Sequence, residues 1–182
     1  MKNEQTYVAL LRGINVGGHH KVPMAALRTA MEQMGFKKII TLLNSGNVIF
    51  TGTPKNESRL EEEIALHLEK VFGFSIPVRV RNAGEILALT TVNPFENIEV
   101  TRDIRLYISF LKEIPEKKLT LPWVSEDNSF RIVDIRGKEV CSVLDVSVTK
   151  TPRGMEMLEQ FFGGDITTRN WNTLNRIAGK LY

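Results

Sequence analysis

Apolar and polar positions along the first 82 residues fall into blocks, and each block predicts one element of secondary structure. The expected elements are strands at 7–11, 39–43, 47–50 and 76–81 and helices at 23–34 and 58–72. The first strand is apolar at successive positions, as expected for a central strand covered on both faces. The order β-α-β-β-α-β is the split βαβ or ferredoxin-like pattern, in which two helices pack on one face of an antiparallel sheet.

Local residue choices mark where these elements begin and end. Pro23 suits a first helical position, because its missing N–H would be unpaired there anyway. Ser58 and Glu61 have the spacing of a capping box at the start of the second helix. Gly73 is expected to end that helix. Pro77 indicates that the following strand lies at a sheet edge.

The second half of the chain also alternates between strand and helix patterns. The expected elements are a helix at 82–92, a strand at 104–111, a loop with a short helix at 113–124, a hairpin of strands at 129–135 and 139–146, a helix at 151–162 and a last helix from about 168. Asn82 and Glu85 have N-cap spacing. Trp171 begins an apolar stripe on the last helix, which should dock against another element.

These patterns predict an α+β protein of two ferredoxin-like halves, each an antiparallel sheet with helices on one face. The expected domains are residues 1–82, which contain a glycine-rich loop at Arg12–Gly18, and residues 83–182, which end in the docking helix. A chain of 182 residues is long enough to bury a core without disulfides or metals.

Composition points to a protein of the cytoplasm. The first residues are polar, the apolar run after them is too short for an export segment, and no stretch approaches about 20 uninterrupted apolar residues. We therefore expect no association with membranes. The single cysteine, Cys141, lies in a strand-like run and is expected to be a buried thiol.

Positive charge is concentrated in the first half of the chain. The net charge is +3, but residues 1–82 carry 11 Lys and Arg against 7 Asp and Glu, whereas residues 83–182 carry 13 against 14. An anionic partner would therefore meet the first half. An ordinary solvated surface explains the same skew.

Glycines, amides and cations gather at loop positions that follow the predicted strands and at the start of the last helix. The candidate set is Arg12, Asn15, Gly17, Gly18, Lys21, Asn44, Ser45, Asn47, Arg169 and Asn170. Glycine-rich loops and helix N-termini present backbone N–H groups to phosphate or carboxylate, and guanidinium groups bind such anions bidentately. The hypothesis is that these residues converge on one anionic ligand.

A purely structural role explains the same residues. Gly17 and Gly18 can serve a turn, Asn44 can begin a hairpin, and Arg169 can latch the last helix while Asn170 caps it. The loop has neither the spacing of a P-loop nor that of a dinucleotide fingerprint.

Catalytic and metal-binding chemistry has little support in the sequence. His19 and His20 are adjacent in a loop without other metal ligands at the right spacing, so we expect no metal and no cofactor. Ser45 does not lie in the Gly-x-Ser-x-Gly nucleophile elbow. The predicted central strands carry aromatic residues only at Tyr7 and Phe50, which disfavours base stacking as in RNA-recognition modules.

Three stretches together resemble a known bacterial family. They are Arg12–Gly18, Asn44–Phe50 and Thr168–Thr173, and they look like the signature blocks of the family called domain of unknown function 1697. The resemblance spans essentially the whole chain and implies a cytoplasmic α+β protein of two ferredoxin-like halves. It implies no activity, cofactor or catalytic residue.

The function expected from the residues is a non-enzymatic binding module for a phosphate-bearing ligand, either a nucleotide or a nucleic acid. One alternative is a small enzyme with a polar site between the halves that uses Arg12, His19 or His20, and Arg169. The other is a protein that binds a partner or associates with itself through an exposed sheet face.

Overall fold

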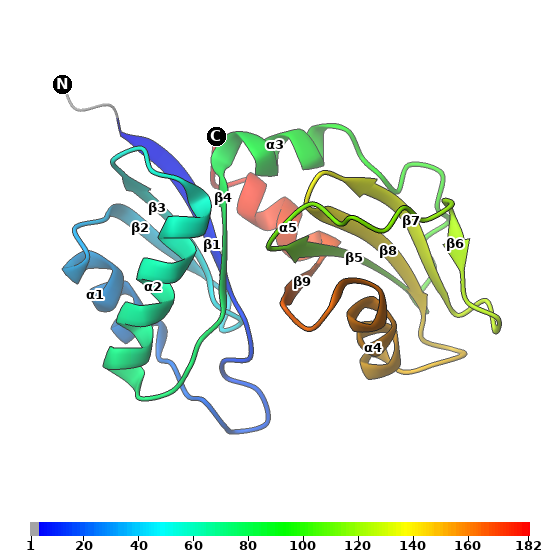
Figure 1. Cartoon of the computed structure of the whole chain (residues 1–182), viewed down its shortest axis with the longest axis horizontal. Coiled ribbons are helices and arrows are strands. Elements are labelled where there is room, and N and C mark those ends of the chain that lie inside the picture. Colours follow the sequence, from blue (N-terminus) through cyan, green and yellow to red (C-terminus); the bar gives the residue numbers. More distant parts are fainter. Residues whose placement is uncertain (1–3) are drawn as a thin grey trace. The chain divides into compact units, whose positions relative to one another are not determined.

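The computed structural model describes residues 4–182, which fold into two compact α+β units (Figure 1). The first unit contains the chain up to Ala88 together with Ile177–Tyr182, and the second unit contains Leu89–Arg176. The predicted fold class is confirmed, because both units combine an antiparallel sheet with helices.

The first unit follows the element order predicted from the sequence. Its elements are β1 (Gln5–Leu11), α1 (Met24–Gln33), β2 (Lys37–Leu42), β3 (Asn47–Gly52), α2 (Glu57–Phe72), β4 (Val78–Asn82) and the start of α3 (Ala83–Thr91). The strand order is β2-β3-β1-β4, and every pair is antiparallel. Strand β4 lies at an edge, as Pro77 predicts.

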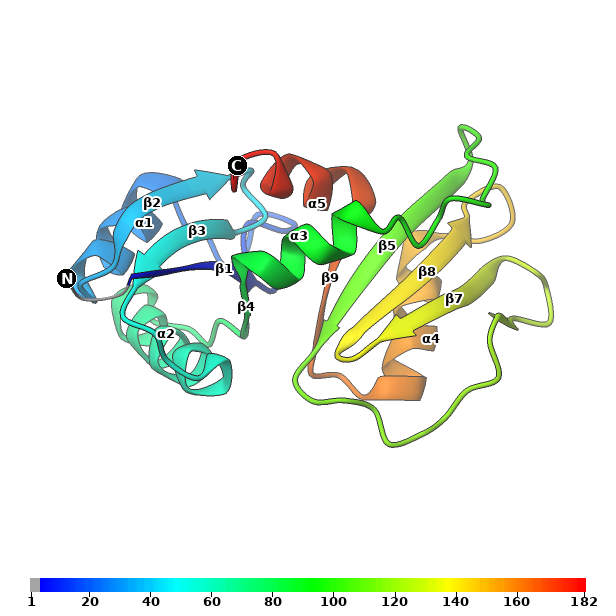
Figure 2. The same ribbon diagram turned by 90° about the horizontal axis from the view of Figure 1, so that it is seen from above.

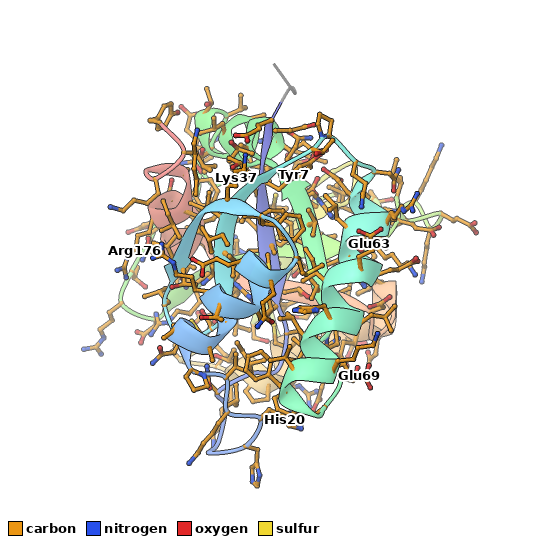
Figure 3. All side chains as sticks on the ribbon, turned by 90° about the vertical axis from the view of Figure 1, so that its left-hand side faces the viewer. Tyr7, His20, Lys37, Glu63, Glu69 and Arg176 are labelled. Atoms are coloured by element: carbon orange, nitrogen blue, oxygen red, sulfur yellow. The ribbon has the colours of Figure 1, made fainter. Side chains whose placement is uncertain are left out.

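The core of the first unit lies between its sheet and its two long helices. Figure 3 shows α1 and α2 on the same face of the sheet. Tyr7 and Leu11 of β1 pack there with Leu27 of α1 and Ile64 of α2. The intervening residue Leu10 points to the opposite face and is also fully buried, which explains why β1 is apolar at successive positions.

Helices α1 and α2 begin differently from what the sequence pattern predicts. The capping box at Ser58 is wrong, because Asn56 caps α2 and its Oδ1 accepts a hydrogen bond from the Arg59 N–H at 3.3 Å. Glu61 is buried and its carboxylate accepts from the Val80 N–H at 2.9 Å instead. Pro23 occupies the N-cap of α1, one residue before the predicted position.

The second unit is built on a larger antiparallel sheet. Its elements after α3 are β5 (Ile104–Leu111), β6 (Trp123–Val124), β7 (Phe130–Arg136), β8 (Glu139–Asp145), α4 (Thr151–Phe162), β9 (Ile166–Asn170) and the greater part of α5 (Trp171–Ala178). The strand order is β6-β7-β8-β5-β9. Strands β7-β8-β5-β9 repeat the relative order of β2-β3-β1-β4, while a loop with β6 takes the place that α1 has in the first unit.

Two predictions for the second half are wrong in detail. Residues 113–124 contain the short strand β6 and no helix. The segment predicted to begin the last helix near Thr168 is strand β9, and α5 begins only at Trp171. The sequence pattern missed β9 because its residues after Ile166 are all polar.

Helix α4 packs on one face of the second sheet, as Figure 2 shows. Leu158 of α4 is buried in one cluster with Phe130 and Leu144 of the strands. A Cβ at Gly154 would lie 2.9 Å from Leu144, so the helix approaches the sheet closely at this glycine. Cys141 is buried as predicted, and burial raises the pKa of its thiol to about 12.

The predicted N-cap of α3 is confirmed and brings two carboxyl groups together. Asn82 Oδ1 accepts from the Glu85 N–H at 3.0 Å, and Glu85 accepts from the Asn82 N–H at 3.2 Å. Glu57 of α2 accepts from the same Asn82 N–H at 2.9 Å. Burial, followed by the hydrogen bond and negative charge of Glu57, raises the pKa of Glu85 to about 7; Asn82 and Arg81 act in the opposite direction.

This pair makes the stability of the protein depend on pH. Because the folded-state pKa of Glu85 is raised from its usual 4.5, the native state holds a proton that the unfolded state releases, and this stabilisation is lost as the pH rises through about 7. Glu85 is only partly buried, so we expect Glu85→Gln to stabilise the protein by about 1 kcal/mol at about pH 8 and to leave it nearly unchanged at about pH 5. Urea unfolding at both pH values measures the change in the free energy of unfolding. Glu62→Gln, at an exposed position of α2, is the control. Equal effects at the two pH values would contradict a shared proton.

Candidate functional site

The glycine-rich loop between β1 and α1 folds back on itself as a small hairpin. Val16 and His19 form an isolated antiparallel bridge, and the His19 N–H donates to the Val16 carbonyl at 3.1 Å. Gly17 and Gly18 occupy the turn with φ of 59° and 79°. A two-residue type I′ turn requires the left-handed backbone conformation at both of its residues, and glycine adopts this conformation at little cost.

Asn15 clamps this hairpin at its base. Its Oδ1 accepts from the Val22 N–H at 2.8 Å, and its Nδ2 donates to the Val22 carbonyl at 2.9 Å. The same Nδ2 donates to the carbonyl of Asn44 at 2.8 Å, which lies in the turn between β2 and β3. One side chain therefore closes the first loop and ties it to the second.

The turn between β2 and β3 is also bound to the end of β1 and has hydrogen bonds of its own. The Leu11 N–H donates to the Gly46 carbonyl at 2.8 Å. The side chain of Asn47 is buried and donates through Nδ2 to Leu42 at 2.8 Å and to Ser45 Oγ at 3.1 Å. Residues 12–22 and 43–47, called the paired loops below, therefore form one local structure.

The paired loops contain most of the candidate residues and divide them into two groups. Asn15 and Asn47 hold the backbone, and Gly17 and Gly18 form the turn. The side chains at the surface are those of Lys21, Asn44 and Ser45, while Arg12 is half-buried. Gly17, Gly18 and Asn44 therefore have the turn roles that the sequence offered as an alternative to ligand binding. The other side chains of the paired loops form a polar and cationic surface.

His19 and His20 are exposed beside this surface, and Figure 3 shows His20 at the foot of the first unit. The imidazole ring of His20 stacks on Phe74 with centroids 4.5 Å apart, and its Nδ1 lies 3.3 Å from the Gly13 carbonyl oxygen. Sequence reasoning missed Phe74, because no local pattern links it to a histidine that lies 54 positions before it. Within residues 4–182, no three His, Cys, Asp or Glu side chains are grouped to hold a metal ion.

Arg169 and Asn170 lie in the second unit, at the end of β9 rather than on the last helix. Arg169 is buried, its Nη1 donates to the Thr168 carbonyl at 3.0 Å, and burial lowers the pKa of its guanidinium to about 10. Asn170 Oδ1 accepts from the Asn172 N–H at 2.9 Å, which caps α5. The expected convergence of Arg12 and Arg169 on one ligand joins residues of different units and stays a prediction.

The fold and the paired loops define the class of the protein as an α+β chain of two antiparallel-sheet units with a clamped glycine-rich loop. Residues 5–140 match the model of the family described as Protein of unknown function (DUF1697). The match covers more than half of the chain, and the chain therefore belongs to this family. The matched residues include two of the three sequence blocks, Arg12–Gly18 and Asn44–Phe50.

A solved structure has the same fold. It is that of the conserved bacterial protein SP0830 from Streptococcus pneumoniae, which matches with a TM-score of 0.71 and 24% sequence identity over 99% of this chain and 100% of that chain. At this identity the likeness shows the fold alone. No curated protein matches the sequence. In the part of the chain that the structure describes, no helix is both long and apolar enough to span a bilayer.

Proposed function

We propose that the first unit is a non-enzymatic binding module for a phosphate-bearing ligand, a nucleotide or a nucleic acid, which it binds on the paired loops. The observation that carries the proposal is the Asn15 clamp, which binds Val22 and Asn44 at once. Because the clamp fixes both loops before any ligand arrives, little conformational entropy is lost when the ligand binds.

The charge of the paired loops suits an anion. Residues 12–22 and 43–47 contain Arg12, Lys21 and two histidines but neither Asp nor Glu. Within residues 4–182, no group accepts a hydrogen bond from the backbone N–H of Gly17 or Gly18, and both glycines are exposed. Cations and backbone N–H groups are the usual partners of phosphate oxygens.

The chemistry of the surface favours binding over catalysis. Ser45 Oγ accepts a hydrogen bond from the Asn47 side chain, so this hydroxyl already has a structural role within the turn. His20 is engaged with Phe74 and Gly13. A small enzyme that uses Arg12, His19 or His20, and Arg169 remains the alternative of a different class.

Thermal unfolding with and without ligand tests the proposal. We expect ATP or a short single-stranded RNA to stabilise the wild-type protein, by about 2.7 kcal/mol at 100 times the dissociation constant. Lys21→Gln should weaken binding about tenfold, because one charge-assisted contact is lost. Lys38→Gln, which removes an exposed lysine from β2, is the control and should bind as the wild type does.

The ligand class follows from the salt dependence. Binding of RNA should weaken steeply with salt concentration in proportion to the phosphates contacted, and binding of ATP should weaken less. Stabilisation that is the same in Lys21→Gln as in the wild type would contradict a site on the paired loops. A hydrolysed nucleotide recovered from the mixture would instead support the enzymatic alternative.

Self-association has one observation of its own. Val16, next to the hairpin turn, is an apolar side chain with 68% of its surface exposed. If Val16→Ser shifts the protein from a dimer to a monomer in sedimentation, the exposed loop serves contact between copies rather than ligand binding.

A further inference from the structure

The second unit contains a hollow of about 310 Å³ beside the start of α5. It is bounded by the segment before β5, by the first residues of β5, and by the first residues of α5. The side chains that matter below are Arg102, Ile104, Arg105, Asn170, Trp171 and Asn172. Its volume lies at the lower end of the range found for small-molecule sites.

The positive charge that lines this hollow is compensated only in part. Two arginines line it and no carboxylate does. Arg105 is half-buried, and within residues 4–182 no Asp or Glu forms an ion pair with it. Arg102 pairs with Asp103 at 3.4 Å, but the Arg102 side chain is 93% exposed, so this pair contributes little. A half-buried guanidinium without a counter-ion favours an anion from solution.

Arg105 is also held in place. Its Nη1 donates to the carbonyl oxygens of Arg102 at 2.6 Å and of Ile104 at 3.2 Å. These contacts use one nitrogen of the guanidinium group, so Nε and Nη2 keep their N–H donors for a ligand. A guanidinium fixed in this way loses little entropy on binding.

The opposite side of the hollow combines amide donors with an aromatic ring. Asn170 uses its Oδ1 to cap α5, which leaves its NH₂ group as the free end of the side chain. Asn172 lines the same side and is exposed. The indole of Trp171 is set by an edge-to-face contact with Phe95, with ring centroids 5.3 Å apart. Donors for an anion therefore lie beside a fixed apolar surface.

We propose that this hollow binds a phosphate monoester, whose phosphate group meets Arg102 and Arg105 and whose organic group lies against Trp171 and Ile104. The site uses no residue of the first unit, and it therefore stands whether or not the paired loops bind a ligand. Of the residues proposed from the sequence for an anion site, only Asn170 lines it.

Tryptophan fluorescence tests the proposal directly. The chain contains two tryptophans, and Trp123 packs against Phe161 away from the hollow, so the full-length Trp123→Phe variant reports Trp171 alone. We expect AMP to quench its fluorescence saturably. Adenosine lacks the charge and inorganic phosphate lacks the organic group, so each should bind at least about tenfold more weakly than AMP.

Variants made in the same background separate the site from a general charge effect. Arg105→Gln should raise the dissociation constant for AMP about tenfold. Arg102→Gln is the second variant and should also weaken binding, because it removes a charge that meets the phosphate. Arg102 is almost fully exposed, so this change should not affect the fold. Arg153→Gln removes the same charge from the exposed side of α4 and should bind as the background does.

The outcomes are distinct. Absence of quenching by AMP at millimolar concentration, or quenching that is equal in Arg105→Gln and Arg153→Gln, would overturn the proposal. Quenching by adenosine as strong as that by AMP would show an apolar site rather than a phosphate site. Lys21→Gln, which tests the paired loops, should leave the quenching unchanged, so the two proposals can fail separately.

Discussion

Replacement of Glu61 by alanine is expected to lower the free energy of unfolding by about 3–5 kcal/mol. The Glu61 side chain is 6% exposed and accepts from Arg79 Nη1 at 3.1 Å, and Arg81 Nη1 lies 3.5 Å from its other oxygen. That oxygen also accepts from the Val80 N–H at 2.9 Å. Removal of the carboxylate takes a shared counter-ion from two buried guanidinium groups. A buried charge that loses its counter-ion destabilises the folded state strongly.

Urea unfolding measures the free energy lost in Glu61→Ala, and two further variants serve as comparisons. Glu62→Ala changes the next residue of α2, which is exposed, and should cost less than about 0.5 kcal/mol. Glu61→Gln keeps an acceptor for the Val80 N–H but removes the charge, so its loss should fall between the other two. If Glu61→Ala costs no more than Glu62→Ala, the arginines do not depend on this carboxylate.

Gly46→Ala is expected to lower the free energy of unfolding by about 2–4 kcal/mol, for two reasons that add. Gly46 has φ of 79°, a conformation that is strained for alanine. A Cβ there would also lie 2.7 Å from Cδ1 of Ile14 and 2.8 Å from Cβ of Leu11, and the Leu11 Cβ is fixed by the backbone of a buried strand. At Gly46 the turn between β2 and β3 therefore packs closely against Leu11 and Ile14.

A matched glycine separates the two reasons. Gly35 has φ of 83°, and a Cβ there would meet no atom within 4 Å. Gly35→Ala should therefore cost only the backbone strain, about 1–2 kcal/mol. Thermal or urea unfolding of both variants gives the comparison. Equal losses in Gly46→Ala and Gly35→Ala would mean that the paired loops can move apart at no cost.

Local patterns in the sequence predicted most of the fold. The order of strands and helices up to Asn82 follows from the spacing of apolar residues, and the N-cap formed by Asn82 and Glu85 follows from residues three positions apart. Such features depend on near neighbours in the chain, and near neighbours can be read from a sequence. Strand β9 was not predicted, because its five mostly polar residues show no clear hydrophobic period. Its pairing with β5 decides its conformation.

Long-range pairing decided the roles of individual polar residues. Glu61 has the spacing of a helix cap after Ser58, but its partners lie about 18 to 20 positions further along the chain. The sequence likewise indicated that Asn15 and Asn44 belong to a candidate site without showing that one clamps the other across 29 positions. The Arg105 hollow has no sequence signature either, because β5 and α5 come together only in the folded second unit.

The sequence by itself determined most of the strands and helices, where glycine must permit a left-handed turn, and that polar and cationic residues gather in loops; β6 and β9 were the exceptions. Only the tertiary structure decided which of those residues support the backbone and which face solvent. The physical reason is that hydrophobic period and turn chemistry act within a few residues, whereas the burial and hydrogen bonding of a polar side chain depend on whichever distant segment packs against it.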